Sequence, residues 1–523
     1  MTDRIRRIAG RLAEWVDELR RREAQLALVL SLVIGVVVGL VVVAFILLTG
    51  RLAAHLYPAG GLGLRRILVP VTGSLLSGFF LYRYFPDARG SGIPQTKAAL
   101  YIRDGRITLR TIFGKFFCCT TSLASGIALG REGPSVQIGA GIASVMARKL
   151  RLSSEQVRAL IPVGGAAALA AAFNTPIAAV LFSLEEIVGD LHAPVLGSVV
   201  ISSATSWITL HLLLGDEPLF HVAAYQLVSA GEFIAYAVLG VACGVASAAF
   251  CRLLLTLRRR FLRLPARTRW WQPVVGGLTV GVMGFFLPDV LGVGYPVVEK
   301  VLGGNMLLQT LIVLAVLKII ATAVCYASGN AGGIFGPSLF IGAMVGGAVG
   351  HLAHAVAPMH TAGAGAYALV GMGAVFAGIV RTPLTSVIMV FEMTRDYSII
   401  VPLMIANLIA FFVSHRLQRA AIYEALAHQD GIHLPTGGYR TPSRHLRVAA
   451  AMGAVPPGWS PPRPTSEAHV HADHGLDVAL RRMGEVHVDV MPVVRRDDIQ
   501  QIIGVVTLPE ILRAYGVDRP PQS

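Results

Sequence analysis

An arginine and a glutamate stand side by side in an otherwise uncharged stretch of the chain. Arg131 and Glu132 are the only Asp, Glu, Lys or Arg residues between Lys115 and Arg148. An ionisable pair at membrane depth costs several kcal/mol unless it serves an ion path. The pair therefore predicts a route for an ion or a proton.

The motif around this pair occurs twice in the chain. GREGPSVQIGA, Gly130–Ala140, returns as GIFGPSLFIGA, Gly333–Ala343, at an offset of 203 residues. After a small insertion the match continues at an offset of 207 residues, so that Glu185 falls on Glu392. The membrane part is therefore predicted to be an internal duplication. Duplicated halves in transporters often have inverted topology. We expect it here, although it requires an odd number of crossings, which short helices make hard to count.

The glycines and prolines of three short motifs indicate helix ends that face a ligand. GSGIP, Gly90–Pro94, precedes GREGP and GIFGP along the chain. Glycine lets the backbone approach a ligand closely, and proline is favoured at the first position of a helix. The exposed N–H groups of such a helix attract an anion. Three helix N-termini and the hydroxyl of Ser91 therefore predict an anion site that needs no full positive charge.

The composition excludes an ordinary soluble protein. Of 523 residues, 54% are hydrophobic and 14% are charged, against about 25% charged in globular proteins. Ile319–Val380 has no Asp, Glu, Lys or Arg over 62 residues, and its glycines and prolines predict several short helices, which membranes tolerate where they line a cavity. The fold class is an all-α polytopic membrane protein of short and broken helices in a lipid bilayer. Four other uncharged segments are near the ~20 residues that span a bilayer as a helix: Ala24–Gly50, Leu160–Leu184, Leu191–Gly215 and Trp270–Pro288.

Changes in hydropathy divide the chain into four regions. They are a cytoplasmic N-terminal helix (1–25), a transmembrane domain (26–430, with repeats near 67–215 and 273–423), a Pro-rich linker (431–465) and a small module (466–523). The module is a small cytoplasmic α/β tail. In it we expect helices at Leu476–Met483 and Leu508–Ala514 and strands at Asp489–Val494 and Gln501–Thr507.

Two arginine-rich runs contribute much of the net charge of +15. One lies between Met1 and Glu23 and the other at 252–269, and both border apolar segments. By the positive-inside rule both flank the cytoplasmic face, which places the N- and C-termini in the cytoplasm. A nucleic-acid patch is the alternative for a basic run, but the adjoining membrane segments argue against a nucleic-acid partner.

Cysteines and histidines give no catalytic pattern. The five cysteines lie in or beside apolar segments without the spacing of a zinc or disulfide framework, and we predict that they are core residues. His351 and His354 have the spacing of two metal ligands on a helix, but without an HExxH pattern we expect them at a helix end. His469, His471 and His474 are expected in a solvated strand or loop. The chain is therefore not predicted to be an enzyme or to hold a metal.

The three Gly-Pro motifs, in this order, resemble the CLC family of chloride channels and proton/chloride antiporters. The resemblance covers roughly residues 26 to 430. It implies a homodimer with a complete pore in each subunit, chloride and protons as transported ions, and no cofactor. The compactness of the chain and its single short tail predict a bacterial protein, and hence the inner membrane as its location. The resemblance also implies that a central chloride is bound by Ser91, by the backbone amides of Ile334 and Phe335, and by the hydroxyl of Tyr423.

The resemblance makes Glu132 the gating glutamate, whose carboxylate competes with chloride for an outer site. Backbone amides around Arg131 and Gly133 would hold that outer site. The physics agrees, because a carboxylate is itself an anion that fits an anion site when charged and leaves it when neutral. Protonation of Glu132 would thereby be coupled to anion occupancy. For the side chain of Arg131 we expect a structural role, holding the loop through hydrogen bonds.

A second carboxylate decides between an antiporter and a channel. In proton-coupled members of the family an internal glutamate follows an AAFNxP segment, and here AAFNTP, Ala171–Pro176, leads to Glu186. Its counterpart in the second half is Met393, whereas Glu185, shared with Glu392, is expected to be structural and to accept helix-end hydrogen bonds. With both carboxylates present, the sequence favours exchange of chloride for protons. The alternative is a passive voltage- or pH-gated chloride channel of the same fold.

The tail resembles a CBS motif, with ALRRM, MPVV and GVVT in the expected order. CBS motifs work in pairs and one copy is recognisable here, so two single motifs could pair across a dimer. The usual Asp after the Thr-x-x of the last strand is Glu510, which argues against nucleotide binding. A packing or regulatory role without a ligand is the alternative.

Overall fold

The computed structural model describes residues 23–58, 63–191, 194–216, 218–220, 228–229, 231–432, 434, 446–455, 469–486, 488–495 and 498–514. It divides into two compact units, residues 1–435 and 436–523, and each is described by itself. Residues 1–22, predicted as a helix, and most of the Pro-rich linker lie outside the described residues.

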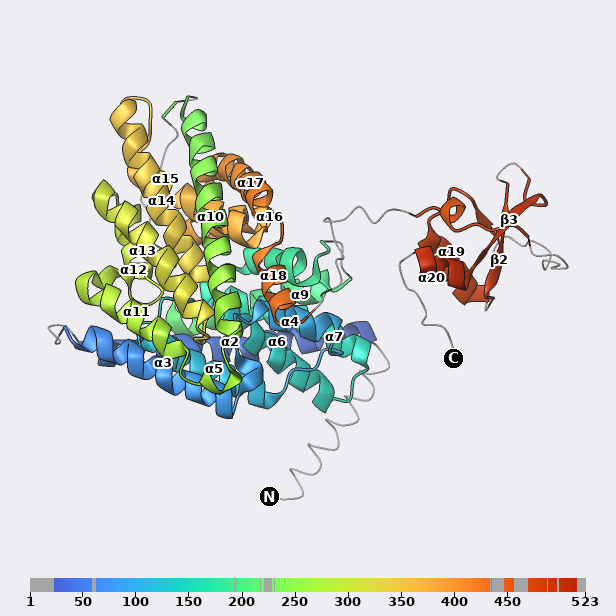
Figure 1. The fold of residues 1–523 in the computed structure, drawn as a ribbon, viewed down its shortest axis with the longest axis horizontal. Helices are drawn as coiled ribbons and strands as arrows, with labels where there is room; N and C mark the ends of the chain where they lie inside the picture. Colours follow the sequence, from blue (N-terminus) through green and yellow to red (C-terminus); the bar gives the residue numbers. More distant parts are fainter. Residues whose placement is uncertain are drawn as a thin grey trace, which may run out of the picture. The chain divides into compact units, whose positions relative to one another are not determined.

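The first unit consists of helices that occur in the same order in two halves (Figure 1). Helix α2 (Glu23–Leu56) precedes both, and α10 (Glu232–Leu262) lies between them. The first half comprises α3 (Arg65–Arg83), α4 (Ile93–Tyr101), α5 (Leu109–Ala124), α6 (Glu132–Lys149), α7 (Ser154–Phe173), α8 (Pro176–Phe182), the π-helical turn η2 (Ser183–Val188) and α9 (Leu196–Leu214). The second comprises α11 (Pro273–Phe286), α12 (Tyr295–Leu302), α13 (Leu308–Ala327), α14 (Phe335–Val356), α15 (Ala364–Val380), α16 (Pro383–Thr394) and α17 (Ile400–Leu417), and α18 (Ile422–Gln429) closes the unit. Short 3₁₀ turns occur at η1 (Pro86–Ala88), η3 (Ala266–Thr268), η4 (Pro288–Val290), η5 (Tyr397–Ile399) and, in the second unit, η6 (Val448–Ala450).

The long uncharged stretches are broken where glycine and proline predict it. Ile319–Val380 holds the end of α13 and all of α14 and α15. The segment Leu160–Leu184, expected as one span, is broken as well. Helix α7 ends at Phe173, the next residue Asn174 has a left-handed backbone (φ 61°), and Pro176 starts α8. The proline cannot supply the N–H that a continuous helix needs, so a new helix begins there.

The first unit is a membrane protein by length and composition of its helices. Seven of the described helices are long and apolar enough to cross a bilayer. All five cysteines are free and buried, which confirms their assignment to the core. Exposed leucine, valine, isoleucine and phenylalanine residues cover the outer faces of helices such as α2, α11 and α17, as expected where lipid is the solvent.

The second unit is the small α/β module that the sequence predicts. Its described elements are β1 (Val470–His471), α19 (Leu476–Val486), β2 (Val490–Val494), β3 (Ile502–Thr507) and α20 (Leu508–Ala514). Strand β2 pairs parallel with β1 and antiparallel with β3. Apolar side chains from all five elements form its core.

Candidate functional site

The two copies of the repeated signature meet inside the first unit. Gly130 and Gly333 each donate their N–H to the other's carbonyl oxygen at 2.7 Å, in an antiparallel bridge. Helix α6 begins at Glu132 and α14 at Phe335, directly after these glycines. Because equivalent residues of the two halves pair with each other, a local two-fold axis passes between the halves. Two helix N-termini therefore converge on one region.

The GSGIP loop brings a third helix N-terminus to the same place. A Cβ on Gly92 would lie 2.2 Å from the carbonyl oxygen of Gly133, so this approach of the two loops needs glycine. Ser91 is fully buried, and its hydroxyl has no hydrogen-bond partner among the described residues. Its N–H donates to the hydroxyl of Tyr326 at 3.2 Å. An unsatisfied buried hydroxyl costs about 1–3 kcal/mol, and an anion accepting from Ser91 would relieve this cost.

The carboxylate of Glu132 lies on the N-terminus of the other half's helix. The residue is fully buried, and its Oε2 accepts a hydrogen bond from the N–H of Gly336, in the first turn of α14, at 3.3 Å. Its Oε1 accepts a hydrogen bond from the hydroxyl of Tyr295. Free N–H groups at a helix N-terminus attract negative charge. Glu132 therefore occupies the kind of position that a chloride ion would take.

Arg131 lies beside this carboxylate rather than holding the loop. Its Nε is 3.9 Å from Oε1 of Glu132, and its guanidinium lies over the ring of Tyr295, 5.4 Å from the centroid. The structure records no hydrogen bond from its side chain to another described residue. The expected anchoring through loop hydrogen bonds is therefore replaced by a contact with Tyr295, a cation–π interaction worth about 0.5–2 kcal/mol.

The predicted chloride ligands of the second half and of the last helix lie on elements that surround the same region. Ile334 and Phe335 stand at the N-cap and first position of α14, whose N–H groups have no partner within the helix. Tyr423 is buried in α18, which packs against α4, the helix that follows Ser91. The structure records no hydrogen bond from its hydroxyl to another described residue. These residues thus present donors that protein groups leave unused.

Two lysines hold the loops of the site through hydrogen bonds to backbone carbonyl oxygens. The ammonium group of Lys115 donates to the carbonyl oxygens of Ala88 and Gly90, both at 2.8 Å. Lys318, its counterpart, donates to Val290 at 3.0 Å. It also donates to the carbonyl of Gly292 at 2.6 Å. Both lysines are fully buried, and the hydrogen bonds of each fix the shape of a loop.

Glu185 and Glu392 exchange helix caps between the two halves, as predicted. Glu185 accepts hydrogen bonds from the N–H and the hydroxyl of Thr385, at the start of α16, at 2.9 and 2.7 Å. Glu392 accepts from the N–H groups of Ile177 and Ala178, at the start of α8, at 2.9 and 2.7 Å. Each carboxylate thus caps a helix N-terminus of the opposite half. The pair follows the same local two-fold axis as the signature loops.

Glu186 has a different partner from its neighbour. Its Oε1 lies 2.9 Å from Nζ of Lys97, on α4, and the two side chains are 7% and 19% exposed. Helix α4 therefore connects the two candidate proton sites. The loop before the helix contacts Gly133, next to Glu132, and Lys97 in its second turn pairs with Glu186. The lysine that neutralises Glu186 was not among the predicted residues.

The described residues hold no group of three or more His, Cys, Asp or Glu side chains placed to bind a metal ion. His351 and His354 lie near the C-terminal end of α14, as expected. A ring nitrogen of His351 is within 2.8 Å of the carbonyl oxygen of Met306.

Comparison with known proteins identifies the family. Residues 73–415 match the family described as voltage gated chloride channel. The chain belongs to this family, the CLC proteins. Its similarity to individual CLC proteins extends over most of their length, as three of them illustrate.

A protein named as a ClcB-like chloride channel from Ralstonia nicotianae is 35% identical over 71% of this chain and 88% of its own length. The H(+)/Cl(-) exchange transporter ClcA of Vibrio campbellii is 34% identical over 70% of this chain and 80% of its own length. Among solved structures, a slow cyanobacterial Cl⁻/H⁺ antiporter matches with a TM-score of 0.71 and 29% identity, covering 77% of this chain and 97% of the antiporter.

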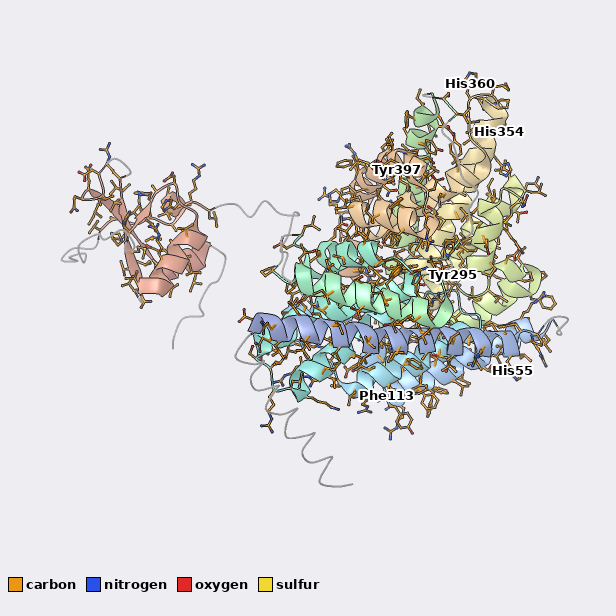
Figure 2. The ribbon with its side chains drawn as sticks, turned by 180° about the vertical axis from the view of Figure 1, so that it is seen from behind. His55, Phe113, Tyr295, His354, His360 and Tyr397 are labelled. Atoms are coloured by element: carbon orange, nitrogen blue, oxygen red, sulfur yellow. The ribbon has the colours of Figure 1, made fainter. Side chains whose placement is uncertain are left out.

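Tyr295 is a residue of this CLC site that the three motifs did not reveal. It belongs to GVGYP, Gly292–Pro296, which corresponds to GSGIP at an offset of 202 residues. Tyr295, labelled in Figure 2, is half-buried at the start of α12. Two features show that the two loops correspond. Lys115 bonds the carbonyl of Gly90 as Lys318 bonds that of Gly292, and each loop leads into a short helix, α4 or α12. Shifting the alignment of the halves by one residue would have revealed this match. The first half thus contributes Ser91 from this loop, and the second contributes the tyrosine that bonds the Glu132 carboxylate.

Glu510, in the first turn of α20, accepts hydrogen bonds from Thr507, the last residue of β3. Its Oε2 accepts hydrogen bonds from the N–H of Thr507 at 3.1 Å and from the hydroxyl of Thr507 at 2.8 Å. The carboxylate therefore closes the turn from β3 into α20, in the manner of a capping box.

Proposed function

We propose that this CLC protein is a secondary active transporter that exchanges chloride for protons. The observation that carries the proposal is the carboxylate of Glu132, which lies on the N-terminus of α14 and accepts a hydrogen bond from Gly336. A site that holds this carboxylate when charged will hold chloride when the carboxylate is protonated and leaves. Glu186 supplies the second carboxylate that proton coupling requires.

In the proposed cycle, the protein holds chloride with neutral and backbone donors. Ser91, Tyr423 and the amides of Ile334 and Phe335 bind the central ion, and the amides around Arg131 and Gly133 bind the outer ion. Protons pass between Glu186 and Glu132 and enter or leave the anion site on the gating carboxylate. Chloride and protons are the transported ions, and no cofactor is proposed.

The comparisons support exchange of chloride for protons and leave one alternative function. An exchange transporter and a solved antiporter are among the similar proteins, whereas the Ralstonia nicotianae protein is named as a channel. A passive chloride channel in which Glu132 only gates is therefore the alternative. Reconstitution in liposomes separates the two: an imposed chloride gradient is expected to drive protons uphill. Chloride movement without proton movement would establish the channel instead.

We further propose a homodimer in a bacterial inner membrane, with a pore in each subunit and both termini in the cytoplasm. Apolar side chains on the outer faces of α9 and α17, such as Leu212 and Phe412, are exposed in the single chain and are available to a second copy. Mass photometry of the detergent-solubilised protein is expected to give twice the mass of the chain. A monomer retaining transport would contradict the proposal.

Removing the hydroxyl of Tyr295 is expected to loosen the gate. A hydrogen bond to a charged group contributes about 1.5–3 kcal/mol, and every 1.4 kcal/mol is tenfold in an equilibrium. Tyr295→Phe should therefore raise chloride transport near neutral pH by about tenfold or more. At a pH acidic enough to open the gate of the wild type, variant and wild type should converge. Chloride efflux measured across the pH range checks this.

Tyr397→Phe serves as the matched control, since it removes a hydroxyl from a tyrosine that is 78% exposed. It should follow the wild type at every pH. If Tyr295→Phe also matched the wild type, the hydrogen bond to Glu132 would have no part in gating.

For the tail, we propose a packing or regulatory role without nucleotide. The Glu510 carboxylate already bonds Thr507 and is not free for a ribose. Isothermal titration with ATP is expected to give no heat of binding. Saturable binding that Glu510→Ala weakens would contradict this.

A further inference from the structure

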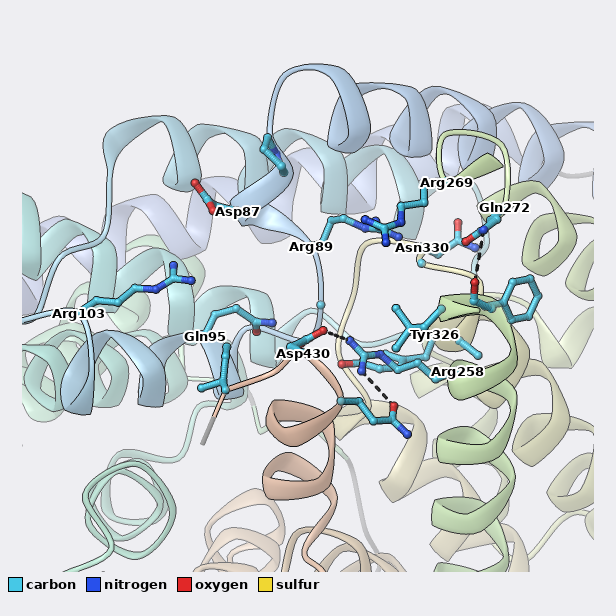
Figure 3. Close-up of a pocket in the computed structure, with 18 residues that line it drawn as sticks. Asp87, Arg89, Gln95, Arg103, Arg258, Arg269, Gln272, Tyr326, Asn330 and Asp430 are labelled. Atoms are coloured by element: carbon cyan, nitrogen blue, oxygen red, sulfur yellow. Dashed lines mark hydrogen bonds and ion pairs between the residues drawn. The ribbon is translucent and has the colours of Figure 1, made fainter. Parts of the chain in front are cut away.

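A polar cavity lies beside the candidate anion site, on the arginine-rich side of the first unit. Its volume is about 410 Å³, and its wall includes Arg89, Arg258 and Arg269 (Figure 3). Tyr326 also lines it, and the hydroxyl of this residue accepts the hydrogen bond from the N–H of Ser91. The cavity therefore adjoins the loop that carries Ser91.

Positive charge in the cavity exceeds the acid available to balance it. Arg258 forms an ion pair with Asp430 and a hydrogen bond with Gln429. Figure 3 shows Arg89 and Arg269 next to each other, and the structure records no ion pair or hydrogen bond from either side chain to another described residue. Burial, followed by the charges of Arg269 and Arg258, lowers the pKa of Arg89. The cluster would gain stability from a bound anion.

The backbone of the second half leaves room for one of these guanidinium groups. Gly329 has a positive φ of 95°, and a Cβ at this position would lie 2.7 Å from Nη2 of Arg89. A larger residue there would displace the guanidinium. Arg89 is thus held against the loop after α13, beside Asn330 and Tyr326, which also line the cavity.

The chemistry of the cavity fits a phosphate group better than chloride. A guanidinium presents parallel N–H donors that match two oxygens of a phosphate, whereas a spherical ion gains nothing from this geometry. The volume falls in the range of about 300–1,000 Å³ typical of sites for small molecules. Multivalent negative charge would also bind here far more strongly than a monovalent ion.

We propose that this cavity binds a phosphate group carrying two or more negative charges, and that its occupancy obstructs the approach of chloride to Ser91. The blocking effect rests on the proposed transport function, whereas the binding does not. Inorganic pyrophosphate is the soluble probe, and phosphatidic acid in the bilayer is the lipid probe of the same chemistry.

Two measurements on the full-length protein test this. Isothermal titration in detergent should show pyrophosphate binding that Arg269→Gln weakens about tenfold; this residue is exposed, so folding should be unaffected. Arg267→Gln, exposed on the same loop but outside the cavity wall, should bind as the wild type does. In neutral-lipid liposomes, pyrophosphate on the arginine-rich face should slow chloride transport, and Arg269→Gln should relieve the inhibition.

The outcomes are distinct. If phosphatidic acid slows transport, pyrophosphate does not, and Arg269→Gln relieves the effect, the site is confirmed and its phosphate comes from lipid. Binding without inhibition would overturn the blocking role. Absence of both effects, or equal effects on Arg269→Gln and Arg267→Gln, would overturn the site. A protein that binds pyrophosphate but transports no chloride would refute the proposed function and leave the site standing.

Discussion

Glu132→Gln is expected to abolish proton transport and to make chloride transport insensitive to pH. Glutamine has nearly the shape of a protonated glutamate, but it cannot release a proton or carry a charge. It therefore cannot compete as an anion for the N-terminus of α14, where the Glu132 carboxylate accepts the N–H of Gly336. Loss of a charged hydrogen bond of about 1.5–3 kcal/mol should raise chloride flux near neutral pH by tenfold or more, since 1.4 kcal/mol is about tenfold.

Paired recordings of chloride and proton flux in proteoliposomes measure both effects on one preparation. Glu299→Gln is the matched control, because it removes a carboxylate from the exposed face of α12, away from the signature loops. It should keep both fluxes and their pH dependence. A Glu132→Gln protein that still moved protons against their gradient would show that the gating carboxylate carries no protons.

The architecture could be predicted because its determinants are local. Gly-Pro pairs mark helix ends through backbone geometry, so the breaks within Ile319–Val380 were expected from the sequence. Duplication also makes each half a check on the other: because Glu185 has a counterpart in Glu392, the sequence predicts a structural role for Glu185, and the reciprocal helix caps agree. The break at Asn174 was missed, because a run of alanines and other apolar residues around it satisfies the composition of a single span.

The site was harder to predict where its contacts join distant segments. Tyr295 lies 163 positions from Glu132 along the chain, and no local sequence pattern predicts a contact between residues so far apart. The shift in offset from 203 to 202 residues also concealed GVGYP as the partner of GSGIP. Lys97 was missed for the same reason, since 89 positions separate it from Glu186. A lysine in an apolar helix could have raised the question of its partner, because a buried charge needs one.

The two candidate proton carboxylates, Glu132 and Glu186, differ in their charged partners. Among the described residues, Glu132 accepts hydrogen bonds from Tyr295 and Gly336 and has Arg131 3.9 Å away. Glu186 instead forms a direct ion pair with Lys97 at 2.9 Å. A proton that reaches Glu186 has to compete with the ammonium group of Lys97 for the same carboxylate oxygen. Lys97 would therefore limit how readily protons enter the protein from the side of Glu186.

Glu186→Gln is accordingly expected to abolish proton coupling while sparing chloride flux, because glutamine cannot relay a proton and the side chain of Glu186 pairs with Lys97, which is not one of the predicted chloride ligands. Lys97→Gln should keep proton coupling but change its pH dependence, because it removes the counterion that lies 2.9 Å from the Glu186 carboxylate. The double variant should behave as Glu186→Gln does, because the lysine acts through the carboxylate. Simultaneous chloride and proton flux measurements across the pH range test all three proteins. Coupling that survived in Glu186→Gln would remove this residue from the proton path, and a pH profile unchanged in Lys97→Gln would reduce the ion pair to a structural contact.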